Sequence, residues 1–223
     1  MKKLIFLGTN SVLMRYIEAA EELGYTIIGI VDSDWYGNRD TFDGIPIIAS
    51  EKNFDKSLYA DCEFFVAVNW SPVAGRDIVK RQKLIDFVYN NDLPCANLIS
   101  PRANVSRTSQ LGKNIFIGAF STLEPYCRVE NFVTLLDFVG IGHDSSIGEN
   151  TFMQRKSGCQ ANIGKNCYIG MGCIIFGKNG NVTINDNAIL DPALHVARDV
   201  LRNEHVTLDR QALRIYRTYN SAA

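Results

Sequence analysis

Hydrophobic residues follow two different spacings along this chain, and the change falls near Pro94. Before that point, short apolar runs predict strands and segments with helical spacing predict helices. The strands are expected at residues 3–7, 25–31, 44–48 and 62–68, and the helices at residues 11–23 and about 73–90. This alternation predicts a small parallel sheet with helices on both faces, which is a Rossmann-like unit.

From Ile99 onward an apolar residue recurs every sixth position. Ten consecutive positions at this spacing hold Ile, Leu, Val or Met: Ile99, Val105, Leu111, Ile117, Leu123, Val129, Leu135, Ile141, Ile147 and Met153. A period of six fits neither a helix nor a simple alternating strand, but it is typical of a hexapeptide β-helix in which each hexad forms one face. Three hexads would close a triangular coil and stack each residue over a later one at the ~4.8 Å strand spacing. The period breaks after Met153, resumes at Ile163, and returns again at Ile184.

These two patterns divide the chain into three segments. We expect a Rossmann-like domain at residues 1–96, a hexapeptide-repeat β-helix at residues 97–200 and a C-terminal tail at residues 201–223. The fold class is therefore α/β plus β. The tail is charged with scattered apolar residues, and its sequence leaves open whether it is a short helix or an extended arm.

Composition excludes several classes of function. The chain has 223 residues with 23 basic and 24 acidic side chains, so it lacks the basic footprint of a nucleic-acid binder. No apolar run approaches the ~20 residues of a membrane helix and the N-terminus lacks a signal-peptide layout, so we expect no membrane insertion and a cytoplasmic protein. The six cysteines form no C-x-x-C pair and are interpreted as free structural thiols. Without a Cys/His cluster, no metal site is expected.

Two passages give the β-helix segment a family resemblance. Residues 142–150 read G-H-D-S-S-I-G-E-N, a histidine and an acid followed by Ile-Gly, and residues 97–106 read N-L-I-S-P-R-A-N-V-S. Together with the pairing of the two domains, they resemble the sialic-acid O-acetyltransferase (NeuD-like) family, which includes bacterial N-acetyltransferases of nucleotide-linked 4-amino sugars. The resemblance covers residues 1 to about 200. It implies a left-handed β-helix, a homotrimer with active sites between subunits, and acetyl-CoA as the acyl donor.

The chemistry implied by this family centres on His143. Acyl transfer from a thioester needs a base to take the proton of the attacking group, and a neutral imidazole suits that task at physiological pH. By resemblance, Asp144 binds the other ring nitrogen and fixes the tautomer. Adjacent residues of a straight strand point to opposite faces, so the pairing requires a bend at this position. An exposed corner histidine without a task is the alternative. His195 and His205 have no such context and are expected to be structural.

The resemblance also implies a binding site for the acyl donor and for the developing oxyanion. Glycine-rich turns are candidates because their backbone N–H groups can donate to an oxyanion. In this sequence they are Gly158 and the turn formed by Gly170, Met171 and Gly172.

In the N-terminal domain, the resemblance implies a sugar-nucleotide site. The family holds the diphosphate in the loop after the first strand and uses acidic residues after the second strand for the base or ribose. The matching residues here are Gly8, Thr9, Asn10 and Ser11 in the loop, Asp32 and Asp34 after the second strand, and Asn69 after the fourth. The loop keeps only one glycine, which weakens the anion site. A helix N-cap at Asn10 or Ser11 and solvated loop carboxylates are the alternatives.

Two departures from the family leave the function open in part. Phe152 stands where many members carry a second histidine, and the Gly-x-Pro-Ala segment of the family is missing after Val196. The expected function is an acyl-CoA-dependent N-acyltransferase that modifies the amino group of a nucleotide-linked amino sugar for surface-glycan synthesis. One alternative is a sugar O-acetyltransferase, which the eroded phosphate loop favours. Another is a catalytically silent trimeric β-helix that serves as a binding or scaffold module.

Overall fold

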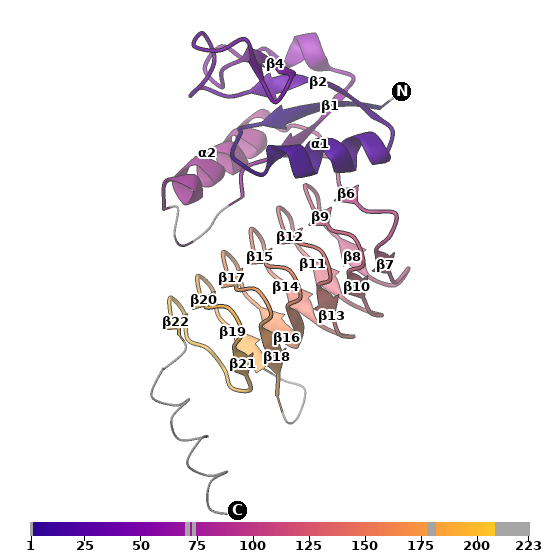
Figure 1. Ribbon diagram of the computed structural model, residues 1–223, viewed down its shortest axis with the longest axis vertical. Coiled ribbons are helices and arrows are strands. Elements are labelled where there is room, and N and C mark those ends of the chain that lie inside the picture. The colour runs from indigo at the N-terminus through magenta and orange to yellow at the C-terminus, as the bar shows by residue number, and fades with distance from the viewer. Residues whose placement is uncertain (1, 70–71, 73–74, 178–181, 208–223) are drawn as a thin grey trace, which may run out of the picture.

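The chain folds into a small α/β unit that lies against one side of a parallel β-helix (Figure 1). This computed structural model describes residues 2–69, 72, 75–177 and 182–207. The fold class expected from the two hydrophobic periods is confirmed, and the β-helix is left-handed. Neither α1 nor α2, within the described residues, has the length and apolarity of a membrane-spanning helix.

The N-terminal sheet has five strands in the order β3-β4-β2-β1-β5. Their bounds are β1 Lys2–Leu7, β2 Tyr25–Val31, β3 Thr41–Phe42, β4 Ile45–Ala49 and β5 Cys62–Val66. The sheet is parallel as predicted, except at one edge, where β3 pairs antiparallel with β4. This short hairpin has no counterpart in the sequence prediction, because two strand residues carry no detectable period.

Helices cover both faces of this sheet because successive residues of β1 point in opposite directions. Leu4 and Phe6 pack with α1 (Leu13–Glu22), whereas Ile5 and Leu7 pack with α2 (Gly75–Asn91). A short 3-10 helix, η1 (Lys56–Tyr59), precedes β5. Helix α1 ends just before Gly24, which takes a positive φ of 77° that a glycine adopts without strain.

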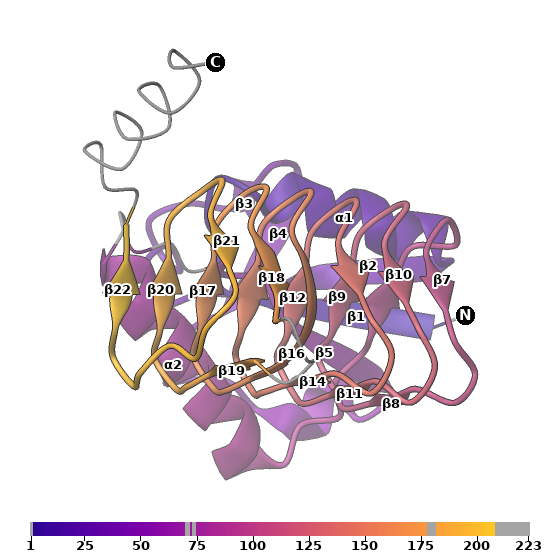
Figure 2. The same cartoon turned by 90° about the horizontal axis from the view of Figure 1, so that it is seen from below.

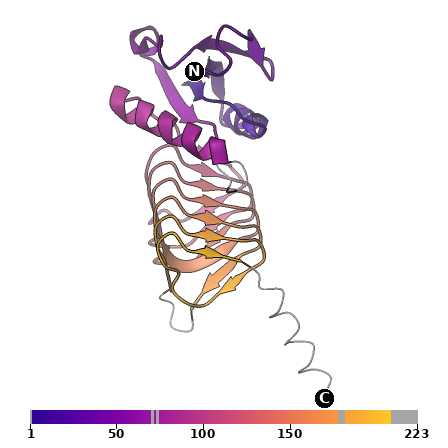
Figure 3. The ribbon, with the colours of Figure 1, turned by 90° about the vertical axis from the view of Figure 1, so that its left-hand side faces the viewer.

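The β-helix has three faces formed by short strands of successive coils, which lie side by side in Figure 2 and are stacked below the α/β unit in Figure 3. The first face consists of β6 Leu98–Ile99, β9 Phe116–Ile117, β12 Thr134–Leu135, β15 Phe152–Met153, β17 Tyr168–Ile169, β20 Ile189–Leu190 and β22 His205–Val206. The second consists of β7 Asn104–Val105, β10 Thr122–Leu123, β13 Gly140–Ile141, the first half of β16 Gly158–Ile163, β18 Ile174–Phe176 and β21 His195–Val196. The third consists of β8 Gln110–Leu111, β11 Arg128–Val129, β14 Ser146–Ile147, the second half of β16, and β19 Val182–Ile184.

The residues of the six-residue period fill the interior of the β-helix, as predicted. From Ile117 to Met153 the residues of this period are buried in one core cluster, which continues through Ile163, Ile175 and Ile184. Stacking by 18 residues is observed where β10 pairs with β13, with Thr122 opposite Gly140. The period therefore predicted the direction of each side chain and the register between coils.

One strand departs from the triangular plan. β16 runs straight from the second face to the third, pairing Ile141 with Cys159 and Ile147 with Ile163. Ile141 and Ile147 are six residues apart in one coil. Their partners in the next coil, Cys159 and Ile163, are only four residues apart. The lower coil therefore lacks the turn between these faces. The break in the period after Met153 marks this missing turn.

The β-helix extends beyond residue 200, where the sequence analysis ended it. β22 pairs with β20, with His205 opposite Ile189. Residues 201–207 thus complete a coil rather than starting a tail. Weak apolar content hid this coil, because Val206 is its only residue on the interior position of the period. Residues 208–223 lie outside the described part of the chain.

A ladder of asparagines runs down the corner between the third and first faces. Asn150, Asn166, Asn187 and Asn203 each have a positive φ, between 54° and 60°. Each side-chain nitrogen donates to the next side-chain oxygen, at 2.9, 3.1 and 2.9 Å in order. Asparagine tolerates this left-handed conformation better than most residues, which explains its recurrence here.

The α/β unit packs on the first face through a shared apolar cluster. Tyr16 of α1 contacts Phe116 edge-on with ring centroids 5.0 Å apart, and Leu136, Phe152 and Tyr168 belong to the same cluster. Charged side chains border it, including Arg15, whose Nη1 lies 2.6 Å from Asp137. The two units therefore share one continuous core across the first face.

Candidate active site

His143 and Asp144 form the turn between β13 and β14, at the corner between the second and third faces. Asp144 has a φ of 58°, and its N–H donates to the Pro125 carbonyl of the coil above at 3.1 Å. This left-handed residue supplies the bend that the pairing needs. His143 Nδ1 lies 2.8 Å from Asp144 Oδ2, and the backbone N–H of His143 donates to Glu124 Oε2 at 3.0 Å.

The imidazole faces solvent with one nitrogen held. The His143 side chain is 56% exposed and that of Asp144 is 70% exposed. A carboxylate only accepts hydrogen bonds, so in the neutral ring Nδ1 carries the proton and Nε2 presents a lone pair. This is the tautomer that a general base requires.

Gln160 is the residue of this corner that sequence reasoning missed. Its side-chain Nε2 lies 3.0 Å from His143 Nε2, and the amide donates because that ring nitrogen carries no proton. The straight run of β16 places Gln160 directly below the His143 turn. Gly142 leaves room for it, since a Cβ on Gly142 would lie 3.0 Å from the Gln160 Cβ. Cys159 falls six residues after Met153 and four residues before Ile163. Had cysteine been counted among the apolar residues of the six-residue period, the sequence would have located the missing turn.

The other histidines lie elsewhere on the β-helix. His205 Nε2 lies 2.8 Å from Asp191 Oδ1 on the first face, while His195 is exposed on β21. A histidine–carboxylate pair therefore occurs twice in the described chain. Of these two pairs, the one at His143 combines an acid in the left-handed conformation with a side-chain amide, that of Gln160, within hydrogen-bond distance of the other ring nitrogen.

The glycine turns expected to donate to an oxyanion are already engaged. The N–H groups of Gly158, Gly170 and Gly172 donate to the carbonyls of Cys173, Leu190 and Arg155 at 2.8, 2.9 and 3.1 Å. These donors belong to the hydrogen bonds between coils, so the expectation that they face an oxyanion is wrong. Met171 is half-exposed beside them, at the corner between the first and second faces.

Phe152 occupies a different environment from the one that the family resemblance suggested. It is 3% exposed on the first face, stacked on Tyr168 with ring centroids 5.8 Å apart. His143 lies at the corner between the other two faces. Phe152 therefore stabilises the junction with the α/β unit, and within this chain it does not take part in the His143 corner.

A cavity of about 1350 Å³ in the α/β unit gathers most of the predicted nucleotide-binding residues. Thr9, Asn10 and Ser11 line it from the loop after β1, and Asp32 and Asp34 line it from the end of β2. Parallel strands end on the same edge of the sheet, and ligands of such sheets bind at that edge.

Gly8 and Asn69 support this cavity from behind. Gly8 has a φ of 75°, and a Cβ there would lie 2.5 Å from Leu84. Asn69 accepts hydrogen bonds from the Tyr16 hydroxyl and, through its carbonyl, from Asn10 Nδ2 at 3.3 Å. Asn10 Oδ1 in turn accepts from the Val12 N–H at 3.1 Å, so Asn10 orders the turn that leads into α1.

Lys80 pairs with two of the four acidic residues that line this cavity. Its Nζ lies 2.9 Å from Asp32 and 2.7 Å from Asp34. Burial lowers the pKa of Lys80, but the hydrogen bonds to Asp34 and Asp32 outweigh it, and the net pKa is raised. Asp32 is fully buried and also accepts from the Thr9 hydroxyl at 2.7 Å. Its carboxylate is thus used internally, whereas the Asp34 side chain is largely exposed.

The cavity wall also has a polar and an aromatic part that sequence reasoning missed. Glu51 accepts from the Ser33 N–H at 2.9 Å, and burial, together with the nearby Asp32 charge, raises the pKa of Glu51. Trp35 and Phe42 form an aromatic pair with ring centroids 6.0 Å apart, and Arg39 lies 5.3 Å from the Trp35 ring. The short hairpin that carries Phe42 could not be predicted, because its two-residue strand is too short to show a hydrophobic period.

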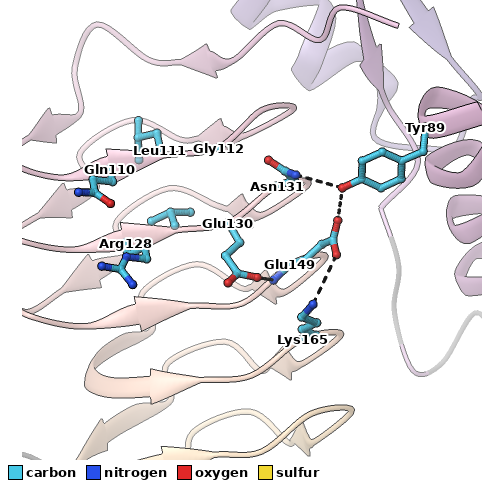
Figure 4. Close-up of a pocket in the computed structure, with 10 residues that line it drawn as sticks. Tyr89, Gln110, Leu111, Gly112, Arg128, Glu130, Asn131, Glu149 and Lys165 are labelled. Carbon is cyan, nitrogen blue, oxygen red and sulfur yellow. Dashed lines mark hydrogen bonds and ion pairs between the residues drawn. The ribbon is translucent and has the colours of Figure 1, made fainter. Parts of the chain in front are cut away.

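A smaller pocket of about 450 Å³ lies between α2 and the third face (Figure 4). Tyr89 of α2 points into it, donates to Glu149 and accepts from Asn131 Nδ2 at 3.0 Å. Burial and the Glu149 hydrogen bond raise the pKa of Tyr89 to about 12. Lys165 approaches the same carboxylate at 4.0 Å. These mutual contacts tie the two units together.

The cysteines and the candidate metal ligands of the described residues were compared with the expectations from the sequence. No group of three or more His, Cys, Asp or Glu side chains there is arranged to hold a metal ion. All six cysteines are free, and burial raises the pKa of each thiol, to about 12 for Cys159. Buried thiols with raised pKa values are poor nucleophiles.

An α/β unit packed on a left-handed β-helix is also the fold of several solved acetyltransferase structures. PerB from Caulobacter crescentus, solved with CoA and GDP-perosamine, shares 20% identity over 90% of this chain and 91% of its own, with a TM-score of 0.75. The acetyltransferase domain of PglB from Neisseria gonorrhoeae shares 18% identity over 92% and 96%, with a TM-score of 0.77. WeeI from Acinetobacter baumannii shares 16% identity over 94% and 98%, with a TM-score of 0.74.

These structures share the fold of this chain over nearly its whole length. The expected resemblance to this group is therefore confirmed for the fold. No protein-family model and no curated protein matches the sequence.

Proposed function

We propose that this protein is an acyl-CoA-dependent N-acyltransferase. Its acyl donor would be acetyl-CoA, and its acceptor the amino group of a nucleotide-linked amino sugar used for surface-glycan biosynthesis. The observation that carries the proposal is the His143 corner, where Asp144 binds Nδ1 of a largely exposed imidazole and so leaves the lone pair on Nε2. The fold shared with PerB, which binds CoA and GDP-perosamine, supports it.

In this proposal His143 is the general base. As the amine of the sugar attacks the thioester carbonyl, Nε2 takes the amine proton. Asp144 keeps the proton on Nδ1 and stabilises the imidazolium that forms. His143 then returns the proton to the leaving thiolate. Glu124 fixes the backbone of His143 by accepting its N–H, so the ring is held at the corner.

The second face supports the donor assignment. Gly140 and Gly158 lie side by side on it, and a Cβ added to Gly140 would meet nothing within 4 Å. Ile174 and Phe176 are half-exposed on the next strand of this face. A flat, partly apolar strip next to His143 fits a pantetheine arm, which combines methylene and methyl groups with two amides. Gly158, Gly170, Met171 and Gly172 remain the proposed cofactor-binding residues.

The large cavity of the α/β unit is the proposed sugar-nucleotide site. Lys52 and Lys83 line it and offer positive charge for a diphosphate, since Lys80 is already paired with Asp32 and Asp34. Trp35 and Phe42 offer aromatic surface for a base. Gly8, Thr9, Asn10, Ser11, Asp32, Asp34 and Asn69 remain the proposed substrate-binding residues, with Asp32, Gly8 and Asn69 acting through the shape of the site.

A homotrimer completes this proposal. The α/β unit packs on the first face, whereas His143 lies at the corner between the other two faces. A sugar bound to the α/β unit would therefore reach its base more directly on a neighbouring copy. The expected active sites lie between subunits for this reason.

Thiol release tests the proposed reaction. Purified protein receives acetyl-CoA with a panel of UDP-, GDP- and dTDP-linked amino sugars, next to free sugars that carry only hydroxyl groups. We expect release with at least one amino sugar, and a loss of about 10²–10⁴-fold in His143→Ala. His195→Ala is the matched control. Release only with hydroxyl acceptors would assign O-acetylation, and no release with any acceptor would reject the enzyme assignment.

A further inference from the structure

The atom that must take the substrate proton is already hydrogen-bonded in this structure. Gln160 Nε2 lies 3.0 Å from His143 Nε2 and donates to its lone pair. That lone pair accepts one strong hydrogen bond, so an attacking amine has to displace the amide before it can deliver its proton. Gln160 therefore stands between the base and any acceptor.

The position of Gln160 follows from the architecture of the coil. The missing turn lets β16 run straight below His143, with Gln160 opposite Phe176 and the next residue, Ala161, opposite Val182. A normal turn would carry this position outward around the corner. Gly142, which has no Cβ, leaves the space into which Gln160 packs. Two separate local features, a shortened coil and a glycine, thus aim one amide at the reactive nitrogen.

The three glycine N–H groups of the predicted turns do not compete for this role. The N–H groups of Gly158, Gly170 and Gly172 are bound between coils. Negative charge that develops on a thioester carbonyl needs a donor within about 2.7–3.1 Å. An amide that has just been displaced from Nε2 remains next to the amine, and hence next to the carbonyl that the amine attacks.

We propose that Gln160 caps His143 in the free protein and donates to the acyl carbonyl oxygen during transfer. This inference rests on the proposed acyltransferase function and adds a catalytic residue to it. The acceptor amine replaces the Gln160 amide on His143 Nε2, and the freed N–H turns to the carbonyl oxygen. Acceptor binding thereby switches Gln160 from blocking the base to stabilising the reaction.

The electrons and the proton balance in this step. The nitrogen lone pair of the amine forms the new C–N bond, and the C=O π electrons move to the oxygen that Gln160 contacts. His143 Nε2 takes the amine proton. The oxygen electrons then re-form the carbonyl while the C–S bond breaks, and the thiolate of CoA takes the proton from His143. The products are an amide and a free thiol.

Steady-state kinetics test the catalytic half of the proposal. Gln160→Met keeps the length of the side chain but removes the donor, and Gln160→Glu replaces the donor by an acceptor. We expect both to lower kcat by about 10²–10³-fold, with little change in the KM for acetyl-CoA. Asn162→Ala, an amide of the same strand bound to Ser146, is the matched control and keeps wild-type kinetics.

Nitrogen-15 NMR of the histidine ring tests the cap without any turnover. The free wild-type protein should show His143 protonated at Nδ1, with an Nε2 resonance that shifts in Gln160→Met and not in Asn162→Ala. An unchanged Nε2 resonance, or a kcat of Gln160→Met within twofold of wild type, overturns the proposal. A shifted resonance in a protein that releases no thiol supports the cap and rejects the acyltransferase function, so the two failures are distinguishable.

Discussion

Arg81 donates from Nε to Asn150 Oδ1 at 2.7 Å and so joins α2 to the asparagine corner of the β-helix. Its other nitrogens donate to the carbonyls of Val68 and Phe132 at 2.5 and 2.6 Å. The side chain is 2% exposed, and burial lowers its pKa to about 10. All three partners are neutral oxygens. A buried guanidinium therefore links both units of the chain through dipoles alone.

Replacing Arg81 by Met should destabilise the protein strongly. Three oxygens would lose their donor inside the junction, at roughly 1–3 kcal/mol for each one left buried without a partner. We expect a loss of about 2–5 kcal/mol in the free energy of unfolding, measured in urea. Gln82→Met on the exposed side of the same helix is the control and should stay within ~0.5 kcal/mol of wild type. A loss below about 1 kcal/mol for Arg81→Met would show that the contact is dispensable.

Asp144 offers a way to separate charge from backbone conformation. Asn tolerates the φ of 58° but cannot act as a carboxylate, so Asp144→Asn should keep the melting temperature and lower kcat by about 10²-fold. Asp144→Ala should lower kcat similarly and also cost roughly 1 kcal/mol of stability, because alanine is strained at positive φ. Kinetics and thermal unfolding of both variants give the comparison. Full activity in Asp144→Asn would argue against the orienting role.

Lys80 is expected to be required for the stability of the fold as long as the Asp32 carboxylate is present. Lys80→Met leaves the fully buried Asp32 carboxylate without its cation, which typically costs about 3–5 kcal/mol. Adding Asp32→Asn to this variant removes the stranded charge and should recover most of the loss. Urea unfolding of the two single variants and the double variant measures the coupling. Additive effects would mean that the pair does not act as a unit.

Glu51 gives a pH-dependent prediction. Burial, and then the Asp32 charge, raise its pKa above the ordinary 4.5, so the folded state favours the protonated form. Its contribution to stability is fully present below pH 4.5 and is lost as the pH rises through the raised value. Glu51→Gln mimics the protonated form and can still accept from the Ser33 N–H. It should therefore melt ~1–3 °C higher than wild type at pH 7, with the difference vanishing at low pH.

Thermal unfolding from pH 4 to pH 8 checks this prediction. Lys52→Gln, a change of charge at the neighbouring position, serves as the control. A difference between Glu51→Gln and wild type that grows toward low pH would contradict the assigned direction.

The β-helix could be predicted from sequence because its signal repeats. Each coil needs an apolar residue at the same three interior positions, so Ile117, Leu135 and Met153 share one environment and one spacing. The α/β unit was predicted almost as well, since β1 and α1 have clear periods of their own. Short elements such as β3 and the last coil at β22 carry too few residues for a period to be seen.

The site could be predicted only where the chemistry is local in sequence. His143 and Asp144 are adjacent, so one segment revealed them. Gln160 and Lys80 reach their partners across 17 and 48 residues, and their contacts depend on the missing turn and on the packing of α2. Phe152 was wrongly associated with the site. The family resemblance suggested a place beside the base, but Phe152 lies on the first face, which packs against the α/β unit.

The asparagine ladder encodes the alignment of the coils a second time. Asn150, Asn166, Asn187 and Asn203 pass hydrogen bonds in one direction, each amide donating to the coil below. Sliding one coil by a single residue would break this chain even if another apolar side chain entered the interior. Ile, Leu and Val can replace one another inside the β-helix with little effect on the packing. The asparagine corner thus specifies the register between coils, because it disfavours misaligned coils that the apolar interior alone would tolerate.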